Sequence, residues 1–84
     1  MNSCIITFRS VTPAQRGENT LRRAGFVCSI QRTPRWMEEQ GCGYSLQVRC
    51  QDAAAAVVVL KDAEIPFRKI YLRRDNGKVE EVQL

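Results

Sequence analysis

Four cysteines are the residues of this 84-residue sequence best suited to chemistry. Cys42 stands in the run Gly41-Cys42-Gly43, where the two glycines leave the backbone free to approach an anion and to donate N–H groups to it. A thiolate in such a position can act as a nucleophile. The sequence has no histidine and no Cys-x-x-Cys pair, so a zinc site is not expected.

The other three cysteines each alternate with apolar residues. Cys4 alternates with Ile6 and Phe8, Cys28 with Phe26 and Ile30, and Cys50 with Leu46 and Val48. Because alternate residues of a strand point to the same face, these three thiols are expected to pack against helices as small buried hydrophobes. Cys42 is then the one cysteine expected in a loop.

Apolar spacing and turn residues predict the elements that position these thiols. Strands are predicted over residues 4–9, 26–32, 44–50 and 65–73. The turn signal Asn76-Gly77 predicts that residues 79–84 fold back as a short edge strand.

Two helices are predicted between these strands. The first is expected to begin at Thr12 as N-cap, with Pro13 in the first helical position and Gln15 completing a capping box, and to stop at Gly25. The second is expected to begin at Asp52 as N-cap. Its apolar stripe comprises Ala53, Ala56, Val57, Leu60 and Ala63.

The order βαββαβ predicts an α+β fold, a ferredoxin-like two-layer sandwich. Its antiparallel sheet is expected to have four strands, with a short fifth strand at the C-terminal edge as an option. Residues 1–84 are expected to form a single domain, with a core over 4–73 and a C-terminal turn and tail over 74–84. The sequence shows no signal peptide and no apolar run of membrane-spanning length, so a cytoplasmic protein without a membrane partner is expected.

In this topology the chain reverses direction at every element, so three connections are expected to meet at one end of the sheet. Cys42 belongs to one of them. Arg9, Arg32, Arg35 and the start of the first helix at Thr12-Pro13 are expected at the same end. Arginines and a helix N-terminus favour a thiolate. The alternatives are a solvated arginine face and a loop cysteine without a role; Trp36, in the same loop, could anchor a partner or cover the loop.

Several short motifs resemble a known family. They are Ile-Thr-Phe-Arg-Ser at 6–10, Thr-Pro-Arg at 33–35, Gly-Cys-Gly-Tyr-Ser-Leu at 41–46 and Ile-Tyr-Leu at 70–72. Together they resemble the small bacterial proteins called putative Se/S carrier-like. The resemblance implies that Cys42 is the carrier thiol, that Gly43 is its fixed companion, and that Pro34 and Arg35 shape the loop. Arg9 and Ser10 match the stretch before the first helix, whereas Gly41 replaces a serine frequent in the family.

The resemblance also implies a mechanism. Cys42 would accept sulfane sulfur or selenium from a donor such as a cysteine desulfurase, hold it as a transient persulfide or selenosulfide, and pass it to an acceptor protein. Thiolate exchange needs an accessible sulfur of low pKa and no other cofactor. Because no acid–base pair is evident, a carrier without catalytic turnover is favoured over an enzyme.

Two other classes of function stay open. With a net charge of +4, the arginine-lined end would suit a regulatory module that binds an anion or nucleic acid. Nucleic acid is not favoured, because Ser45, Gln47 and Arg49 are the expected outward residues of the third strand and offer no stacking aromatic. A structural subunit could instead form a homodimer through the open sheet face. The apolar residues expected there are Ile5, Val27, Ile70 and Leu72.

Overall fold

The computed structural model describes residues 3–32 and 43–82. Along the chain the elements are β1 (Ser3–Phe8), α1 (Val11–Arg23), β2 (Cys28–Arg32), β3 (Tyr44–Arg49), α2 (Cys50–Asp62), β4 (Ile70–Arg73) and β5 (Val79–Val82). The predictions made for Pro34, Arg35, Trp36, Gly41 and Cys42 lie outside the described residues.

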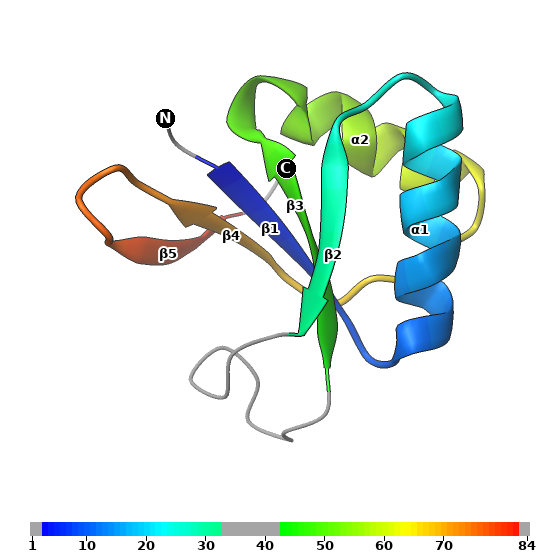
Figure 1. Cartoon of the computed structure of the whole chain (residues 1–84), viewed down its shortest axis with the longest axis horizontal. Coiled ribbons are helices and arrows are strands. Elements are labelled where there is room, and N and C mark those ends of the chain that lie inside the picture. The colour runs from blue at the N-terminus through cyan, green and yellow to red at the C-terminus, as the bar shows by residue number, and fades with distance from the viewer. Residues whose placement is uncertain (1–2, 33–42, 83–84) are drawn as a thin grey trace.

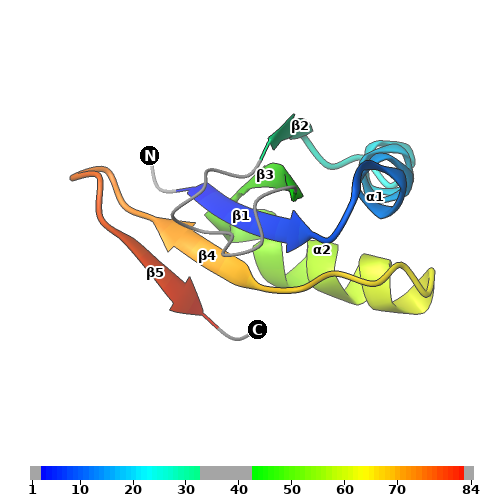
Figure 2. The same ribbon diagram turned by 90° about the horizontal axis from the view of Figure 1, so that it is seen from below.

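The five strands form one antiparallel sheet in the order β2-β3-β1-β4-β5 (Figure 1). Both helices contribute to a single core with alternate residues of β1, so they cover the same face of the sheet. The β4–β5 hairpin extends away from α1 (Figure 2). The predicted α+β class, antiparallel sheet and two helices are confirmed, but the sheet has five strands rather than four.

The fifth strand follows from the turn that the sequence predicted. Gly77 has φ +87°, a left-handed conformation that glycine adopts without strain. The Arg74 N–H donates to the Lys78 carbonyl at 2.8 Å, and the Asn76 side-chain oxygen accepts from the Lys78 N–H at 3.0 Å. The turn sets the register of the hairpin, in which Val79 lies opposite Arg73.

Both predicted helix starts are wrong by two or three residues. Ser10 is the N-cap of α1, and Thr12 and Pro13 lie inside the first turn. Proline is tolerated there because the first N–H groups of a helix have no intrahelical acceptor. Arg49 is the N-cap of α2, and Asp52 lies in its first turn, where it accepts a hydrogen bond from Arg49 Nε at 3.2 Å.

The first helix packs unusually close to the sheet at Gly17. A Cβ built there would lie 3.2 Å from Leu46 Cδ1 and from Phe8 Cζ, and 3.3 Å from Leu60 Cδ2. The helix ends at Arg23 with Ala24 as its C-cap, slightly before the predicted stop at Gly25, and Gly25 follows with φ +93°. The Gly25 N–H donates to the Arg22 carbonyl and the Phe26 N–H to the Leu21 carbonyl, which is the Schellman pattern of C-capping.

The second helix also confirms its predicted stripe. Ala53, Ala56, Val57 and Leu60 are buried in the core, and Ala63 packs against it. The same pattern of C-capping bonds recurs at the end of α2, although Glu64 rather than glycine holds the positive φ there, at 57°.

The strand after α2 is shorter than predicted, and its apolar side chains lie on the other side of the sheet from the one predicted. β4 begins only at Ile70, where it pairs with Ile6, and Leu72 pairs with Cys4. Directly paired residues share a face, so Ile70 and Leu72 face the helices and not the opposite side. Ile5 does lie on the opposite side but is fully buried. Of the four apolar residues expected on an open face, only Val27 is exposed.

Candidate functional site

One end of the sheet gathers the residues that the sequence singled out. Tyr44 of β3 pairs with both Phe8 and Arg32, so the end of β1, the end of β2 and the start of β3 lie side by side. Arg9 directly follows Phe8, and Gly43 directly precedes Tyr44. The connections after β1 and between β2 and β3 therefore leave from the same end, which lies at the bottom of the sheet in Figure 1.

The third connection, from α2 to β4, reaches the same end. The Arg68 N–H donates to the Thr7 carbonyl at 2.8 Å, and the Thr7 N–H donates to the Lys69 carbonyl at 2.8 Å. Arg68 is thereby held beside the last residues of β1. We call this end, defined by Arg9, Arg32, Gly43 and Arg68, the basic end.

A hollow of about 360 Å³ opens at the basic end between the start of α1 and the segment before β4. It is lined by Arg9, Ser10, Pro13, Pro66, Phe67 and Arg68. The two arginines give it a positive lining, and no acidic residue is among those that form it. A negatively charged group placed here would be stabilised by the guanidinium charges.

The start of α1 adds to the positive potential of this end. Ser10 is the N-cap but makes no side-chain capping bond, and the first turn contains no acidic residue. The N–H groups of a first helical turn carry partial positive charge and attract anions. Thr12 lies in this turn and is exposed. Ser10 and Thr12 therefore border the basic end, as predicted for Thr12.

The structure thus brings together Arg9, Thr12 and Arg32, which the topology placed at this end, with Ser10 and Gly43, which the family resemblance singled out. Pro66, Phe67 and Arg68 were missed. The topology did place the α2–β4 connection here, but residues 65–69 were predicted as strand, so their side chains were not considered for the site. Because Gly41, Cys42, Pro34, Arg35 and Trp36 lie outside the described residues, their contacts stay predictions.

Two of the described cysteines are buried as predicted. Cys4 is 4% exposed and Cys28 is 7% exposed. The pKa of Cys4 is raised to about 12, first by burial and then by the hydrogen bond and charge of Cys50. Burial also raises the pKa of Cys28, although the hydrogen bond with Arg22 acts in the opposite direction. Both thiols are therefore protonated near neutral pH and are poor nucleophiles.

Cys50 departs from its prediction. It is the first residue of α2 rather than the last of a strand, and it is half-buried. Its sulfur lies 3.2 Å from that of Cys4. Cys50 is therefore the most accessible of the three described thiols, and its nearest reactive neighbour is another cysteine.

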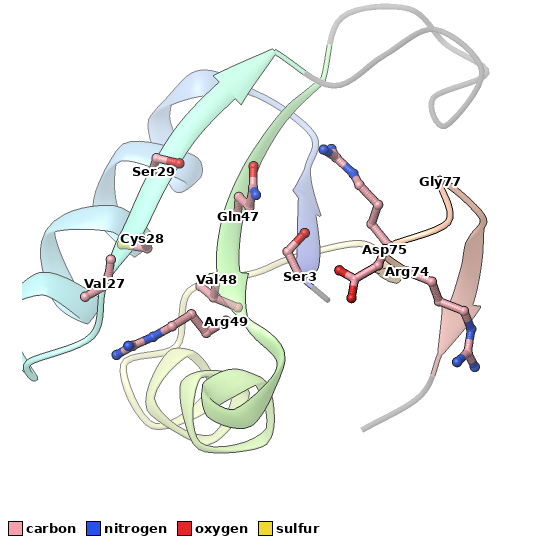
Figure 3. A pocket seen from close by; sticks show the side chains of 11 residues that line it. Ser3, Val27, Cys28, Ser29, Gln47, Val48, Arg49, Arg74, Asp75 and Gly77 are labelled. Carbon is pink, nitrogen blue, oxygen red and sulfur yellow. The ribbon is translucent and has the colours of Figure 1, made fainter. Parts of the chain in front are cut away.

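A second and larger hollow lies at the opposite end of the sheet (Figure 3). Its volume is about 560 Å³, and Ser29, Gln47 and Ser3 line it from β2, β3 and β1. Two arginines on its border are already engaged, since Arg49 pairs with Asp52 at 3.2 Å and Arg74 with Glu80 at 2.6 Å. Among the described residues that line it, the only cysteine is the buried Cys28, so these residues are not suited to thiol chemistry.

Two classes of site can be checked in the described part of the chain. Within residues 3–32 and 43–82, no group of three or more cysteine, aspartate or glutamate side chains is arranged to hold a metal ion. Over the same ranges, no helix is long and apolar enough to cross a membrane.

Comparison with known protein families gives a match. Residues 3–72 match the model of the family described as putative Se/S carrier protein-like. No curated protein and no solved structure matches the chain. The matched range contains all four cysteines and every residue of the basic end.

Proposed function

This chain belongs to the putative Se/S carrier protein-like family, and on that basis we propose that it carries sulfur or selenium on the thiol of Cys42. The family match over residues 3–72 is the observation that carries this proposal, because the family's name states the cargo. The choice of Cys42 as the residue that holds the sulfur or selenium rests on the properties of the other cysteines and on the charge of the basic end.

The other three cysteines suit this role poorly. A carrier thiol must be ionised and reachable by two partner proteins in turn. Cys4 and Cys28 are buried, and burial raises the pKa of each. Cys50 is in contact with Cys4 at the far end of β1. Cys42 is separated by one residue from Tyr44, and Tyr44 pairs with the last residues of β1 and β2 at the basic end.

The proposed reaction is sulfur transfer by thiolate exchange. The Cys42 thiolate attacks the outer sulfur of a donor persulfide, a new S–S bond forms on Cys42, and the bond to the donor sulfur breaks as the donor thiolate leaves. A nucleophile on the acceptor then takes the outer sulfur and releases the Cys42 thiolate. Selenium would follow the same two steps through a selenosulfide, and neither step needs a cofactor.

The basic end would assist both steps through its charge. Arg9, Arg32 and the start of α1 stabilise negative charge on sulfur, which favours the attacking thiolate and its later release. Arg35 is proposed to act in the same way, with Pro34, Gly41 and Gly43 shaping the backbone around the thiol. Trp36 is proposed as a docking residue for the donor, such as a cysteine desulfurase, or for the acceptor.

The fold proposed for this carrier is a ferredoxin-like sandwich extended by one strand. The order β2-β3-β1-β4 among the first four strands supports this classification, and β5 adds to the edge formed by β4. The extension lies beyond the residues that match the family, since the match ends at residue 72. We also propose that the protein works in the cytoplasm, where a reduced Cys42 would be maintained.

The proposal is tested by loading the protein from a cysteine desulfurase supplied with cysteine. Intact mass spectrometry should detect added sulfur on the wild type and on Cys28→Ser, and no addition on Cys42→Ser. Cys28→Ser is the matched control, because it removes a thiol without altering the proposed carrier. Equal addition to wild type and Cys42→Ser would disprove the proposal.

A second candidate function is the binding of a small anion at the hollow beside Arg9 and Arg68. Phosphate binding measured by calorimetry should then weaken on Arg9→Gln and with added salt, and should survive Cys42→Ser. Survival in the Cys42→Ser variant separates this function from sulfur transfer.

A further inference from the structure

The sulfur atoms of Cys4 and Cys50 lie 3.2 Å apart, although 46 positions separate the two residues in the sequence. Cys4 is in β1 on the face covered by the helices, and Cys50 is the first residue of α2. The chain leaves β3 and turns over the same face as it enters α2. This turn brings the Cys50 side chain onto Cys4.

This thiol pair is separate from the proposed carrier site. Cys4 lies four residues before Phe8 on β1, and at about 3.4 Å per residue this places it about 14 Å from the basic end. The pair therefore cannot share a reacting atom with a group bound at the basic end. Its chemistry has to be considered independently of sulfur transfer by Cys42.

Cys28 is excluded as a partner of this pair by the sheet itself. Cys4 and Cys28 both pair with Val48, from opposite sides of β3. Two strand spacings of about 4.8 Å then separate their backbones by roughly 10 Å, which is beyond the reach of a disulfide. Among the described cysteines, Cys4 can bond only to Cys50.

We propose that Cys4 and Cys50 form an oxidation site, at which a low-molecular-weight disulfide converts the two thiols to an intramolecular disulfide. Such a bond needs the sulfurs to close from 3.2 Å to about 2.05 Å. The approach requires a movement of about 1 Å, and it occurs at the first residue of a helix, where no preceding helical turn restrains the side chain.

The reaction proceeds by two exchanges. Cys50, the more exposed of the two, loses its proton and attacks one sulfur of the small disulfide, which gives a mixed disulfide and releases one small thiolate. Cys4 is a poor nucleophile toward molecules in solution, but it is held 3.2 Å from the Cys50 sulfur. It loses its proton, attacks the Cys50 sulfur and displaces the second small thiolate. In sum, two protein thiols are oxidised and one small disulfide is reduced to two small thiols.

The sequence makes this site easy to map. Trypsin cleaves after Arg9, Arg23, Arg32, Arg35, Arg49 and Lys61, so the four cysteines fall in four different peptides, 1–9, 24–32, 36–49 and 50–61. The reduced full chain carrying Cys42→Ser, which lacks the proposed carrier thiol, is incubated with oxidised glutathione. Remaining thiols are then blocked with iodoacetamide, and the peptides are identified by mass spectrometry.

The expected result is joint loss of the alkylated forms of peptides 1–9 and 50–61, with the appearance of one species that links them. Peptide 24–32 should stay fully alkylated, and dithiothreitol should restore both lost forms. Adding Cys50→Ser should abolish the linked species and leave Cys4 reduced. Adding Cys28→Ser, the matched control, should leave the linked species unchanged.

Three outcomes would overturn the proposal. In the first, Cys4 remains a free thiol, and is fully alkylated, at glutathione ratios that oxidise dithiothreitol. In the second, Cys50 forms the mixed disulfide with glutathione and reacts no further. In the third, the linked species joins other peptides or two protein chains. Because Cys50 is half-buried, Cys50→Ser is expected to fold, and its circular dichroism spectrum checks this directly. The wild type tests sulfur loading separately, so either proposal can fail without the other.

Discussion

Thr7 and Ser45 lie directly opposite each other on β1 and β3, yet only the Thr7 hydroxyl has hydrogen-bond partners. Thr7 Oγ1 donates to the Lys69 carbonyl at 3.1 Å and accepts from the Lys69 N–H at 3.0 Å. Ser45 is 0% exposed and its hydroxyl is unsatisfied. Thr7 therefore holds the segment before β4 at the basic end through hydrogen bonds. Burial of the unpaired Ser45 hydroxyl, in contrast, lowers the free energy of unfolding.

The two hydroxyls should respond in opposite ways to removal. Thr7→Val should lower the free energy of unfolding by about 1–2 kcal/mol, because it leaves the backbone of Lys69 without two bonds. Ser45→Ala should leave that free energy unchanged or raise it by up to about 1 kcal/mol, because an unpaired buried hydroxyl is removed. Urea unfolding of the two variants tests both predictions. Equal losses of stability in Thr7→Val and Ser45→Ala would contradict the different roles of the two hydroxyls.

The close packing at Gly17 gives a second prediction. Gly17→Ala should destabilise the protein by about 1 kcal/mol, because crowding three buried side chains costs about 1–3 kcal/mol and better helix propensity returns only about 1 kcal/mol. Asn19→Ala, at an exposed position of the same helix, is the matched control and should be neutral or slightly stabilising. A Gly17→Ala protein as stable as Asn19→Ala would show that the core yields without strain.

The buried thiol of Cys4 predicts how stability depends on pH. Its pKa is raised from 9.0 to about 12 in the folded state, first by burial and then by Cys50. The unfolded chain therefore loses this proton first as the pH rises. The stabilising contribution is complete below about pH 9 and is lost progressively between about pH 9 and 12. The raised pKa of Cys28 acts with the same sign.

This dependence can be measured by urea unfolding under reducing conditions from pH 7 to 11. Wild type and Cys4→Ala are compared, so that the lysines and tyrosines common to both cancel. The stability advantage of the wild type should be constant up to about pH 9 and should shrink above it. An advantage that grows with pH would contradict the assigned direction of the pKa shift.

The charge of the basic end predicts the reactivity of Cys42. Arg9→Gln and Arg32→Gln should each slow the alkylation of Cys42 at neutral pH by about two- to fivefold, because losing a nearby positive charge lowers the thiolate fraction. The effect should diminish in high salt, since added ions screen exposed charges. Arg23→Gln is the matched control, because Arg23 lies in the last turn of α1, at the helix end away from Ser10. A control that slows the reaction equally would point to net charge alone.

The alternation of apolar residues was enough to predict β1, β2 and β3 to within two residues at each end. Cys4, Ile6 and Phe8 face the helices because alternation along β1 leaves no other register with an apolar face. The reversal of direction at each element then placed Arg9, Arg32 and the start of the first helix at one end. Neither inference needed side-chain detail, which is why both could be made from the sequence.

The details that failed depend on long-range contacts. Ser10 and Thr12 are both of residue types that favour the N-cap position, and the structure uses Ser10. Gly17 interrupts the stripe of the helix, so only its distance to Phe8 and Leu46 reveals its role. Cys50 continues the alternation of β3 in sequence, whereas the structure starts α2 at this residue and turns its sulfur onto Cys4.

The most direct test of the account is a pulse and chase of sulfur followed on all four cysteines at once. The wild-type chain is loaded with sulfur by a limiting amount of cysteine desulfurase. One sample is then treated with an excess of a small acceptor thiol, and a second sample is not. In both samples the thiols are blocked, the protein is digested with trypsin and the peptides are compared. If Cys42 is the carrier thiol, added sulfur should be found on peptide 36–49, which contains Cys42, and should be lost during the chase. Sulfur spread over several of the four peptides, or retained through the chase, would contradict it.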